Sequence, residues 1–412
     1  MMKFLKGSFY FSLLLTAVFG LFHLYEYATG GPFVAYLQAN SEVKPLDDAF
    51  DYGIMAEDIA ANDLILVGEI HGFDAPAKFD VDFFRYLHGE YGVRTYFAEL
   101  DYLQAKEMND YLTSGEEAFL QKALRKWAVI QGRDNQDYLE KYRALHKFHA
   151  ALPAADKFRI EGVDRITDWR LLINFLNPLV LPADSMHMLP MSVDDLPVNA
   201  LALIERLQPA YSENGDTALA LQMLLADLEA RRDSLNRDAR MAANFTRLFR
   251  YRELAGQKCY GFFGLGHVFQ YRVNGSDPMA SLLRQSDLGL GGKILSANFI
   301  MNDSEMTMKS DQLPGFLADD GPYTALDVSA DDFLFMYLFG VKDLKRVTPK
   351  YHKAIIKLDG PDNPYANSGR LQSTFRLVPV QPKTVMDEPG KVYAQYMIFV
   401  RNSPWAEPVA RE

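Results

Sequence analysis

The chain has 412 residues, 49% hydrophobic and 24% charged, which is typical of a globular protein with one large domain or two ordinary ones. A net charge of -11 without a basic cluster excludes a nucleic-acid footprint, so no nucleic-acid partner is expected. Because Cys259 is the single cysteine, an intrachain disulfide and a cysteine-based metal site are both excluded.

Residues 1–30 predict a signal anchor or a signal peptide. Lys3 and Lys6 precede Gly7–Tyr25, a stretch without Asp, Glu, Lys or Arg that is nearly long enough to span a bilayer. We expect an uncleaved anchor in the cell membrane. It would form a single N-terminal span and leave the domain on the periplasmic or extracellular side, because the lysines stay inside. The small residues Ala28-Thr29-Gly30 leave open secretion after cleavage.

Residues 31–60 predict a linker and a lead-in helix, and residues 61–350 predict the main domain. Within that domain, short apolar runs alternate with helical segments, a pattern that predicts an α/β fold with a mostly parallel central sheet flanked by helices. A stripe of leucines predicts a long helical region from about Asp216 to Leu254, which we interpret as a helical insertion. The first four apolar runs end near Gly72, Glu99, Asp164 and His267, and two further strands are expected at 293–301 and 333–341.

Residues 351–412 predict a β-rich C-terminal extension. Three strands are expected at Tyr351–Leu358, Ser373–Val380 and Lys391–Arg401, with prolines between them. Two interpretations stay open for this region. It adds antiparallel strands to the main sheet, or it forms a separate small β module that binds a partner or a polymer.

Polar side chains follow the first four apolar runs. In parallel α/β sheets the ligand lies beyond the carboxyl ends of the strands, so Glu69, His71, Glu99, Asp164 and His267 are predicted to meet at one site. Glu69 and His71 are two residues apart and share one face of a strand. The carboxylate can fix the tautomer of the imidazole and raise its basicity, or both side chains can ligate a divalent metal.

The predicted long helix carries Arg237, Arg240 and Asn244 on one face, at i, i+3 and i+7. Arginine can stabilise a developing oxyanion or hold a carboxylate or phosphate. A solvated charged helix face is the alternative interpretation of the same spacing.

Several catalytic motifs are missing from the sequence. It contains no Gly-x-Ser-x-Gly, no Gly-x-x-x-x-Gly-Lys-Ser/Thr, no Gly-x-Gly-x-x-Gly that opens a helix, and no His-Glu-x-x-His. The predicted site therefore holds His, carboxylates and Arg without a covalent nucleophile. Such a site suits direct attack by water that histidine deprotonates or a metal activates.

The order of several motifs resembles the erythromycin esterase family. The motifs are Gly68-Glu69-x-His71-Gly72, Gly92–Glu99, Asn109-Asp-Tyr-Leu112, Gly162-Val-Asp164, Arg237-Asp238-x-x-Met241-Ala242-x-Asn244 and Gly264-x-Gly266-His267. The resemblance covers about residues 60–345 and extends to the wider superfamily with Tiki-type proteases and ChaN-like haem-uptake lipoproteins. It implies an α/β fold with a deep cleft.

The resemblance also implies roles for individual residues. His71 would correspond to the base that activates water against a lactone ester, with Glu69, Glu99, His267 and Arg237 completing the site. One departure concerns the first motif, because the esterases usually place two residues between Glu and His, whereas only Ile70 intervenes here. This shorter spacing resembles the haem-uptake and Tiki branches.

These observations predict a membrane-tethered, extracytoplasmic hydrolase that cleaves an ester or amide bond in a small-molecule or peptide substrate. Two alternatives stay open: a noncatalytic envelope protein that binds haem or another ligand, and a Tiki-like metalloprotease. A divalent metal, or haem, is accordingly an open question as cofactor. The expected catalytic residues are His71, Glu69, Glu99, His267 and Arg237, the expected substrate-binding residues are Arg240, Asn244 and Asp164, and the candidate metal ligands are Glu69, His71, Glu99 and His267.

Overall fold

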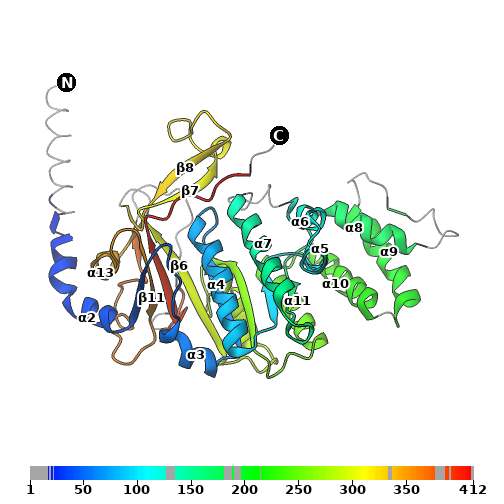
Figure 1. Cartoon of the computed structure of the whole chain (residues 1–412), viewed down its shortest axis with the longest axis horizontal. Coiled ribbons are helices and arrows are strands. Elements are labelled where there is room, and N and C mark those ends of the chain that lie inside the picture. Colours follow the sequence, from blue (N-terminus) through cyan, green and yellow to red (C-terminus); the bar gives the residue numbers. More distant parts are fainter. Residues whose placement is uncertain are drawn as a thin grey trace.

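The structure, a computed structural model, describes residues 17, 20–21, 23–126, 135–180, 188–189, 196–213, 215–332, 336–375, 386–388 and 391–409. Its centre is an eight-stranded sheet (Figure 1). The strands from β13 to β4 pair in parallel, whereas β11 is antiparallel to both of its neighbours. The predicted mostly parallel α/β sheet is therefore confirmed. The spatial order is β1 (Ser41–Pro45), β11 (His352–Lys357), β13 (Tyr396–Arg401), β6 (Ile294–Asn302), β2 (Leu64–Glu69), β5 (Cys259–Gly264), β3 (Thr95–Ala98) and β4 (Arg159–Gly162).

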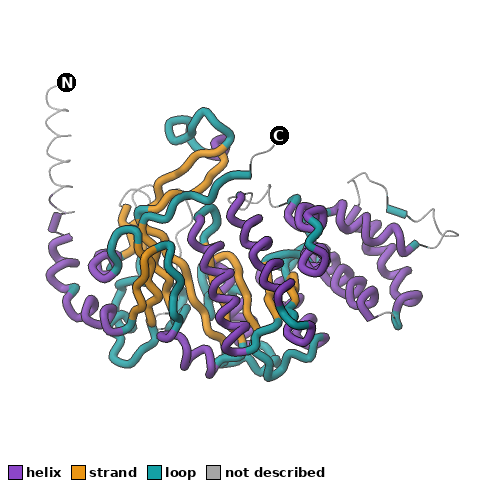
Figure 2. The backbone as a smooth tube through the Cα atoms, viewed as in Figure 1, coloured by secondary structure: helices purple, strands orange, loops and turns teal. Residues whose placement is uncertain are grey.

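Helices cover both faces of the sheet (Figure 2). Alternate residues of β2 enter two different cores, Ile65 and Val67 on one face and Leu64 and Leu66 on the other. The first face packs against α4 (Asp74–Tyr91) and α7 (Gln136–Ala151). The second packs against α11 (Arg237–Tyr251) and α12 (Met279–Gln285).

Helix α4 forms where its apolar stripe predicts it. Phe79, Phe83, Phe84 and Leu87 are all buried against the sheet, at the spacing of one helix face. The helix ends at Gly92, whose φ of 66° is the left-handed conformation that glycine adopts without steric cost. The predicted helix and its C-terminal stop are therefore confirmed.

A group of helices lies beyond β4, at the right of Figure 1. A separate core joins the last three of them. The region expected as one long helical stretch is two helices, because Asn236 caps the start of α11 and separates it from α10. The group comprises α5 (Tyr102–Ser114), α6 (Glu117–Leu124), α8 (Trp169–Leu176), α9 (Leu196–Tyr211) and α10 (Gly215–Arg232).

Strands from the N-terminal and C-terminal regions form the edge of the sheet that lies away from β4. Residues 31–60, expected as a linker and a lead-in helix, contain α2 (Gly31–Ala39), the edge strand β1 and α3 (Ala56–Ala61). β1 has no buried residue, as is characteristic of an edge strand, and its sequence therefore has no apolar pattern that predicts a strand. β13 is fully buried between β11 and β6, so the β-rich region expected from residue 351 contributes two strands to the main sheet, β11 antiparallel to its neighbours and β13 parallel to β6.

Smaller elements complete the structure. A hairpin of β7 (Ser304–Lys309) and β8 (Tyr323–Val328) projects at the carboxyl end of β6 (Figure 1). Residues 333–335 of the strand expected at 333–341 lie outside the described residues. The described part contains β10 (Met336–Leu338), in a small sheet with β9 (Asp331–Asp332) and β12 (Thr374–Phe375), and α13 (Val341–Val347) follows it.

The buried cap of α5 predicts a pH-dependent stability. Asp101 is 1% exposed and accepts hydrogen bonds from the backbone of Gln104 and Thr167. Burial raises its pKa to about 7, despite these bonds. A carboxyl whose pKa is raised by folding costs no stability below the unfolded pKa, and the cost grows as the pH rises toward 7.

We therefore expect Asp101→Asn, which keeps the capping oxygen, to raise the free energy of unfolding by about 1–2 kcal/mol at pH 8. The gain should vanish near pH 4, and urea unfolding at the two pH values measures it. Asp48→Asn, at an exposed loop position, is the control. An equal gain at both pH values would show that the buried charge is not its source.

Candidate active site

The end of β2 and the following loop carry the first part of the site. Glu69, the last residue of β2, is 2% exposed, and its Oε1 accepts hydrogen bonds from His71 Nδ1 and from the hydroxyl of Tyr138 on α7. A carboxylate only accepts, so this contact places the imidazole proton on Nδ1. His71 is 26% exposed, and its Nε2 makes no hydrogen bond to any part of the chain that the structure describes. An unprotonated, accessible Nε2 is the arrangement of a general base.

The ends of β3 and β4 carry the second part. Glu99 follows β3, and its Oε2 accepts a hydrogen bond of 2.6 Å from the backbone of Gly264 at the end of β5. Arg237, the first residue of α11, donates from Nη2 to Glu99 and to Asp164, and from Nε to Asp164 at 3.0 Å. Arg237 therefore neutralises two carboxylates that burial would otherwise make costly.

His267 carries the third part, on the short helix η6 (Leu265–Val268). Its Nδ1 lies 2.7 Å from Oδ1 of Asp238, and its Nε2 lies 3.9 Å from Oε1 of Glu99. Burial opposes the charged imidazole, but the bond to Asp238 and the carboxylate of Glu99 outweigh it and raise the pKa of His267. These two contacts favour the positively charged form of His267, beside the guanidinium of Arg237.

Two glycines allow these parts to approach one another. A Cβ on Gly264 would lie 3.3 Å from Oε2 of Glu99 and 3.5 Å from Nε2 of His71, so both side chains lie against the same point on β5. A Cβ on Gly68 would lie 2.4 Å from Val268, which shows that η6 packs directly on β2. The glycines flanking the predicted residues therefore serve close approach.

The structure brings six predicted residues together, although their contacts differ from the expected roles. Glu69 and His71 are paired, and Glu99, Asp164, Arg237 and His267 are linked by ion pairs. Arg237 was expected to stabilise an oxyanion, yet it already holds two carboxylates, with Nη1 free of hydrogen bonds to the described residues. Asp164 was expected to bind substrate, and its contact is with Arg237.

Arg240 and Asn244 are not brought to this site, which corrects their expected role in substrate binding. Arg240 is 5% exposed and pairs with Asp227 at 2.6 Å. Asn244 is 4% exposed and donates to the carbonyl of Val163 at 3.0 Å. Their helix face points into the protein, where Arg240 and Asn244 connect α11 to α10 and to the end of β4.

The four candidate metal ligands do not assemble as a metal site. Among the residues that the structure describes, no group of three His, Cys, Asp or Glu side chains is placed to hold a metal ion. The carboxylates already have other partners. Glu69 accepts hydrogen bonds from His71 and Tyr138, and Glu99 forms an ion pair with the guanidinium of Arg237. The donor set therefore does not fit a resident divalent cation.

Two residues of the cluster, Tyr138 and Asp238, were not predicted as site residues from the sequence. Tyr138 lies in a helical segment 69 residues from its partner Glu69, and no local pattern marks that contact. Asp238 stands inside the motif with Arg237 and also accepts the backbone N–H of Met279, at the start of α12, at 2.8 Å. Its position next to Arg237 in the first turn of α11 was the one signal that could have identified it.

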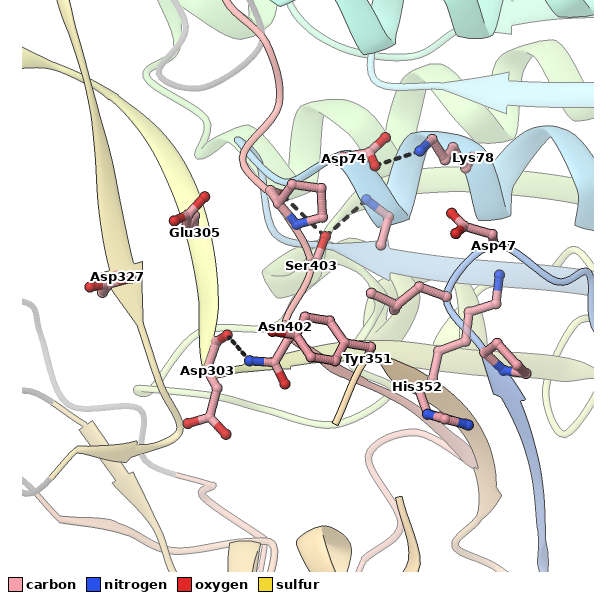
Figure 3. A pocket seen from close by; sticks show the side chains of 15 residues that line it. Asp47, Asp74, Lys78, Asp303, Glu305, Asp327, Tyr351, His352, Asn402 and Ser403 are labelled. Carbon is pink, nitrogen blue, oxygen red and sulfur yellow. Dashed lines mark hydrogen bonds and ion pairs between the residues drawn. The ribbon is translucent and has the colours of Figure 1, made fainter. Parts of the chain in front are cut away.

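A cavity of about 820 Å³ lies at the same edge of the sheet (Figure 3). It is lined by Asp74 and Lys78 of α4, by Asp303 after β6, and by Asn402 and Ser403 after β13. None of the predicted site residues lines it. The candidate catalytic side chains thus lie at the ends of β2, β5, β3 and β4. The cavity lies next to them, at the ends of β6 and β13.

The C-terminal segment 403–408 connects the two regions. Its residue Ala406 donates to the carbonyl of Gly72, next to His71, and the carbonyl of Glu407 accepts from Gln136 at the start of α7. Trp405 forms an isolated bridge with Phe73. The segment therefore holds both the loop that carries His71 and the helix that carries Tyr138.

No family model matches the chain, and no curated protein matches its sequence. Solved structures do match over almost the whole chain. A succinoglycan biosynthesis protein is 13% identical with a TM-score of 0.62, covering 93% of this chain and 99% of that one. A Bacillus cereus protein is 15% identical with a TM-score of 0.60, covering 92% and 98%. An erythromycin esterase, EreC, in its open conformation is 12% identical with a TM-score of 0.58, covering 90% and 100%. The chain therefore has an erythromycin esterase-like fold.

Proposed function

We propose that the chain is a hydrolase in which His71 deprotonates a water molecule that attacks an ester or amide carbonyl of a small-molecule or peptide substrate. The observation that carries the proposal is the pairing of Nδ1 of His71 with buried Glu69, which leaves an accessible Nε2. The erythromycin esterase-like fold supports an ester as the first substrate class to test.

The proposed steps use groups of this cluster alone. Nε2 of His71 takes a proton from water, and the hydroxide oxygen bonds to the carbonyl carbon to give a tetrahedral oxyanion. The oxyanion would be stabilised by His267, whose pKa is raised, and by Nη1 of Arg237, which makes no hydrogen bond to the described residues. The imidazolium of His71 then returns the proton to the departing alkoxide or amine as the bond to carbon breaks.

The experiment is hydrolysis of aryl esters and lactones of increasing size by the purified chain in a chelator. We expect turnover that the chelator does not change, because the donor set does not fit a metal. Turnover that requires added zinc would contradict the proposed mechanism, and absence of turnover with every ester, lactone and peptide would contradict the function.

Tyr138 tests how the base is held. Its hydroxyl and Nδ1 of His71 share Oε1 of Glu69. Tyr138→Phe removes one charged hydrogen bond, which contributes about 1.5–3 kcal/mol, so kcat/KM should fall about tenfold or more. Because Tyr138 is proposed to position Glu69 against His71 and not to bind substrate, the loss should fall on kcat and leave KM unchanged.

Tyr91→Phe is the matched control for Tyr138→Phe. It also loses a hydroxyl hydrogen bond, to the carbonyl of Ala56, but lies at the far end of α4. We expect it to leave kcat and KM unchanged. If Tyr138→Phe changes kcat no more than Tyr91→Phe does, Tyr138 does not act through Glu69.

A further inference from the structure

The helical segment 23–29, which precedes α2, has an inverted distribution of polar and apolar side chains. Glu26 is completely buried, whereas Leu24 is 63%, Tyr25 59% and Tyr27 64% exposed. A helix that packs on a protein in water normally buries its apolar residues and exposes its carboxylates. Something other than water is therefore expected around the outer face of this segment.

Glu26 is built into the folded domain. Its carboxylate accepts hydrogen bonds from the hydroxyl of Tyr337 and, at 2.7 Å, from the backbone N–H of Gly340. Its backbone carbonyl accepts from Arg370 at 3.0 Å, and Arg370 also donates to the hydroxyl of Thr29 at 2.6 Å. The polar contacts of this segment thus reach residues more than 300 positions away in the sequence.

The small residues Thr29 and Gly30 serve the same contact. A Cβ on Gly30 would lie 2.5 Å from Oδ1 of Asp343 and 3.0 Å from the carbonyl of Glu26, so a larger residue would require its neighbours to shift. Asp343 in turn pairs with Arg370 at 2.6 Å, with both side chains buried. The small residues Ala28-Thr29-Gly30 left cleavage open, yet close packing against Asp343 accounts for the small size of Gly30.

We propose that residues 23–30 are a permanent part of the folded domain, that the leader is retained, and that the exposed face of this segment lies in the lipid interface. The occupant is a bilayer because Leu24, Tyr25 and Tyr27 continue the uncharged stretch Gly7–Tyr25, and tyrosines are enriched at membrane interfaces. Cleavage after residue 28 or 30 would remove Glu26 and withdraw an acceptor from buried Tyr337. This inference is independent of the proposed hydrolysis.

Among the described residues, no helix is long and apolar enough to cross a membrane. Most of the predicted anchor, residues 7–16 and 18, 19 and 22, lies outside the described residues. The first test is therefore direct. The full chain is produced with a C-terminal tag in a bacterial host that exports it, and the membrane fraction and culture fluid are analysed by intact mass. We expect a membrane-bound chain that retains residues 1–30, and a folded chain that begins at any position from 26 to 31 would overturn the proposal.

A second test probes the docking of Glu26. Limited proteolysis should cut the segment 20–30 at least tenfold faster in Glu26→Ala than in the wild type, with partial protection regained in Glu26→Gln. Glu90→Ala, at an exposed position on α4, is the matched control. If Glu26→Ala does not accumulate, Tyr337→Phe removes the same hydrogen bond. Wild-type cleavage rates in the soluble Glu26 or Tyr337 variant would contradict the docking.

A third test addresses the lipid. Because Cys259 is 1% exposed, a new cysteine can be labelled selectively with a polarity-sensitive fluorophore. In nanodiscs of phosphatidylethanolamine and phosphatidylglycerol, the label at Leu24→Cys or Tyr27→Cys should emit at shorter wavelength than at Glu90→Cys. Equal emission at the three positions would show that this face is in water and would overturn the lipid contact.

Discussion

Replacing His71 by Asn is expected to lower kcat/KM for an ester substrate by about 10²- to 10⁴-fold, the usual contribution of a general base. The amide of Asn can still contact Glu69 but cannot take a proton from water. The loss should fall mainly on kcat, because His71 is proposed to act in the transition state and not in substrate binding. Initial rates at saturating and limiting substrate separate the two parameters.

His146→Asn is the control for the His71 variant. His146 is also partly buried and bonded through Nδ1, to the carbonyl of Leu112 on α5 at 3.0 Å. It lies on α7, eight residues after Tyr138, and contacts none of the residues linked to Glu69 or Glu99 in the described structure. Its activity should stay within about twofold of the wild type, with thermal unfolding confirming that both variants fold. Undiminished hydrolysis by His71→Asn would remove His71 from the mechanism.

Replacing Lys141 by Met is expected to destabilise the fold by about 3–5 kcal/mol, the cost of leaving one member of a buried ion pair. Lys141 on α7 is 2% exposed and pairs with Asp80 of α4, a fully buried carboxylate, at 2.5 Å. The hydroxyls of Tyr96 and Tyr260 donate to the same carboxylate at 2.6 Å. Urea unfolding monitored by circular dichroism measures the change.

Two further variants identify the source of that loss. Lys106→Met breaks an exposed i, i+4 pair with Asp110 and should cost less than about 1 kcal/mol. Lys141→Met combined with Asp80→Asn should cost less than the sum of the single changes, because the second change removes the unpaired charge. An additive double variant would show that Lys141 contributes through other contacts, such as that of Nζ with the Phe262 ring at 4.3 Å from the centroid, and not through its pairing with Asp80.

The strand ends could be predicted because their signal is local. β2 and β5 are buried on both faces of a parallel sheet, so their sequences are continuous apolar runs. The polar residues near the end of each run can be read directly from the sequence. The parallel arrangement then places Glu69, Glu99 and His267 at one edge without knowledge of the strand order. β1 and the central place of β13 could not be predicted, since both depend on pairing across more than 90 residues of sequence.

The spacing of Arg237, Arg240 and Asn244 predicts their shared helix face but not the residues that they contact. The spacing correctly puts the three side chains on one side of α11, which packs on the sheet. Their partners, however, are Glu99 with Asp164, Asp227, and the carbonyl of Val163, on three different segments. Of these three, Arg237, at the first turn, is the one that pairs with the carboxylates of the candidate site. Which end of a helix faces the site is a property of the tertiary structure.

The proposal that His71 deprotonates water is tested most directly by measuring which nitrogen of its ring carries the proton. In protein labelled with ¹⁵N-histidine, long-range ¹H–¹⁵N correlation spectra distinguish a protonated Nδ1 from a protonated Nε2. We expect the histidine signal that His71→Asn removes to show its proton on Nδ1 and a free Nε2, and we expect Glu69→Gln to alter that signal. A His71 signal with the proton on Nε2 would contradict the account, because Nε2 could then not accept a proton from water.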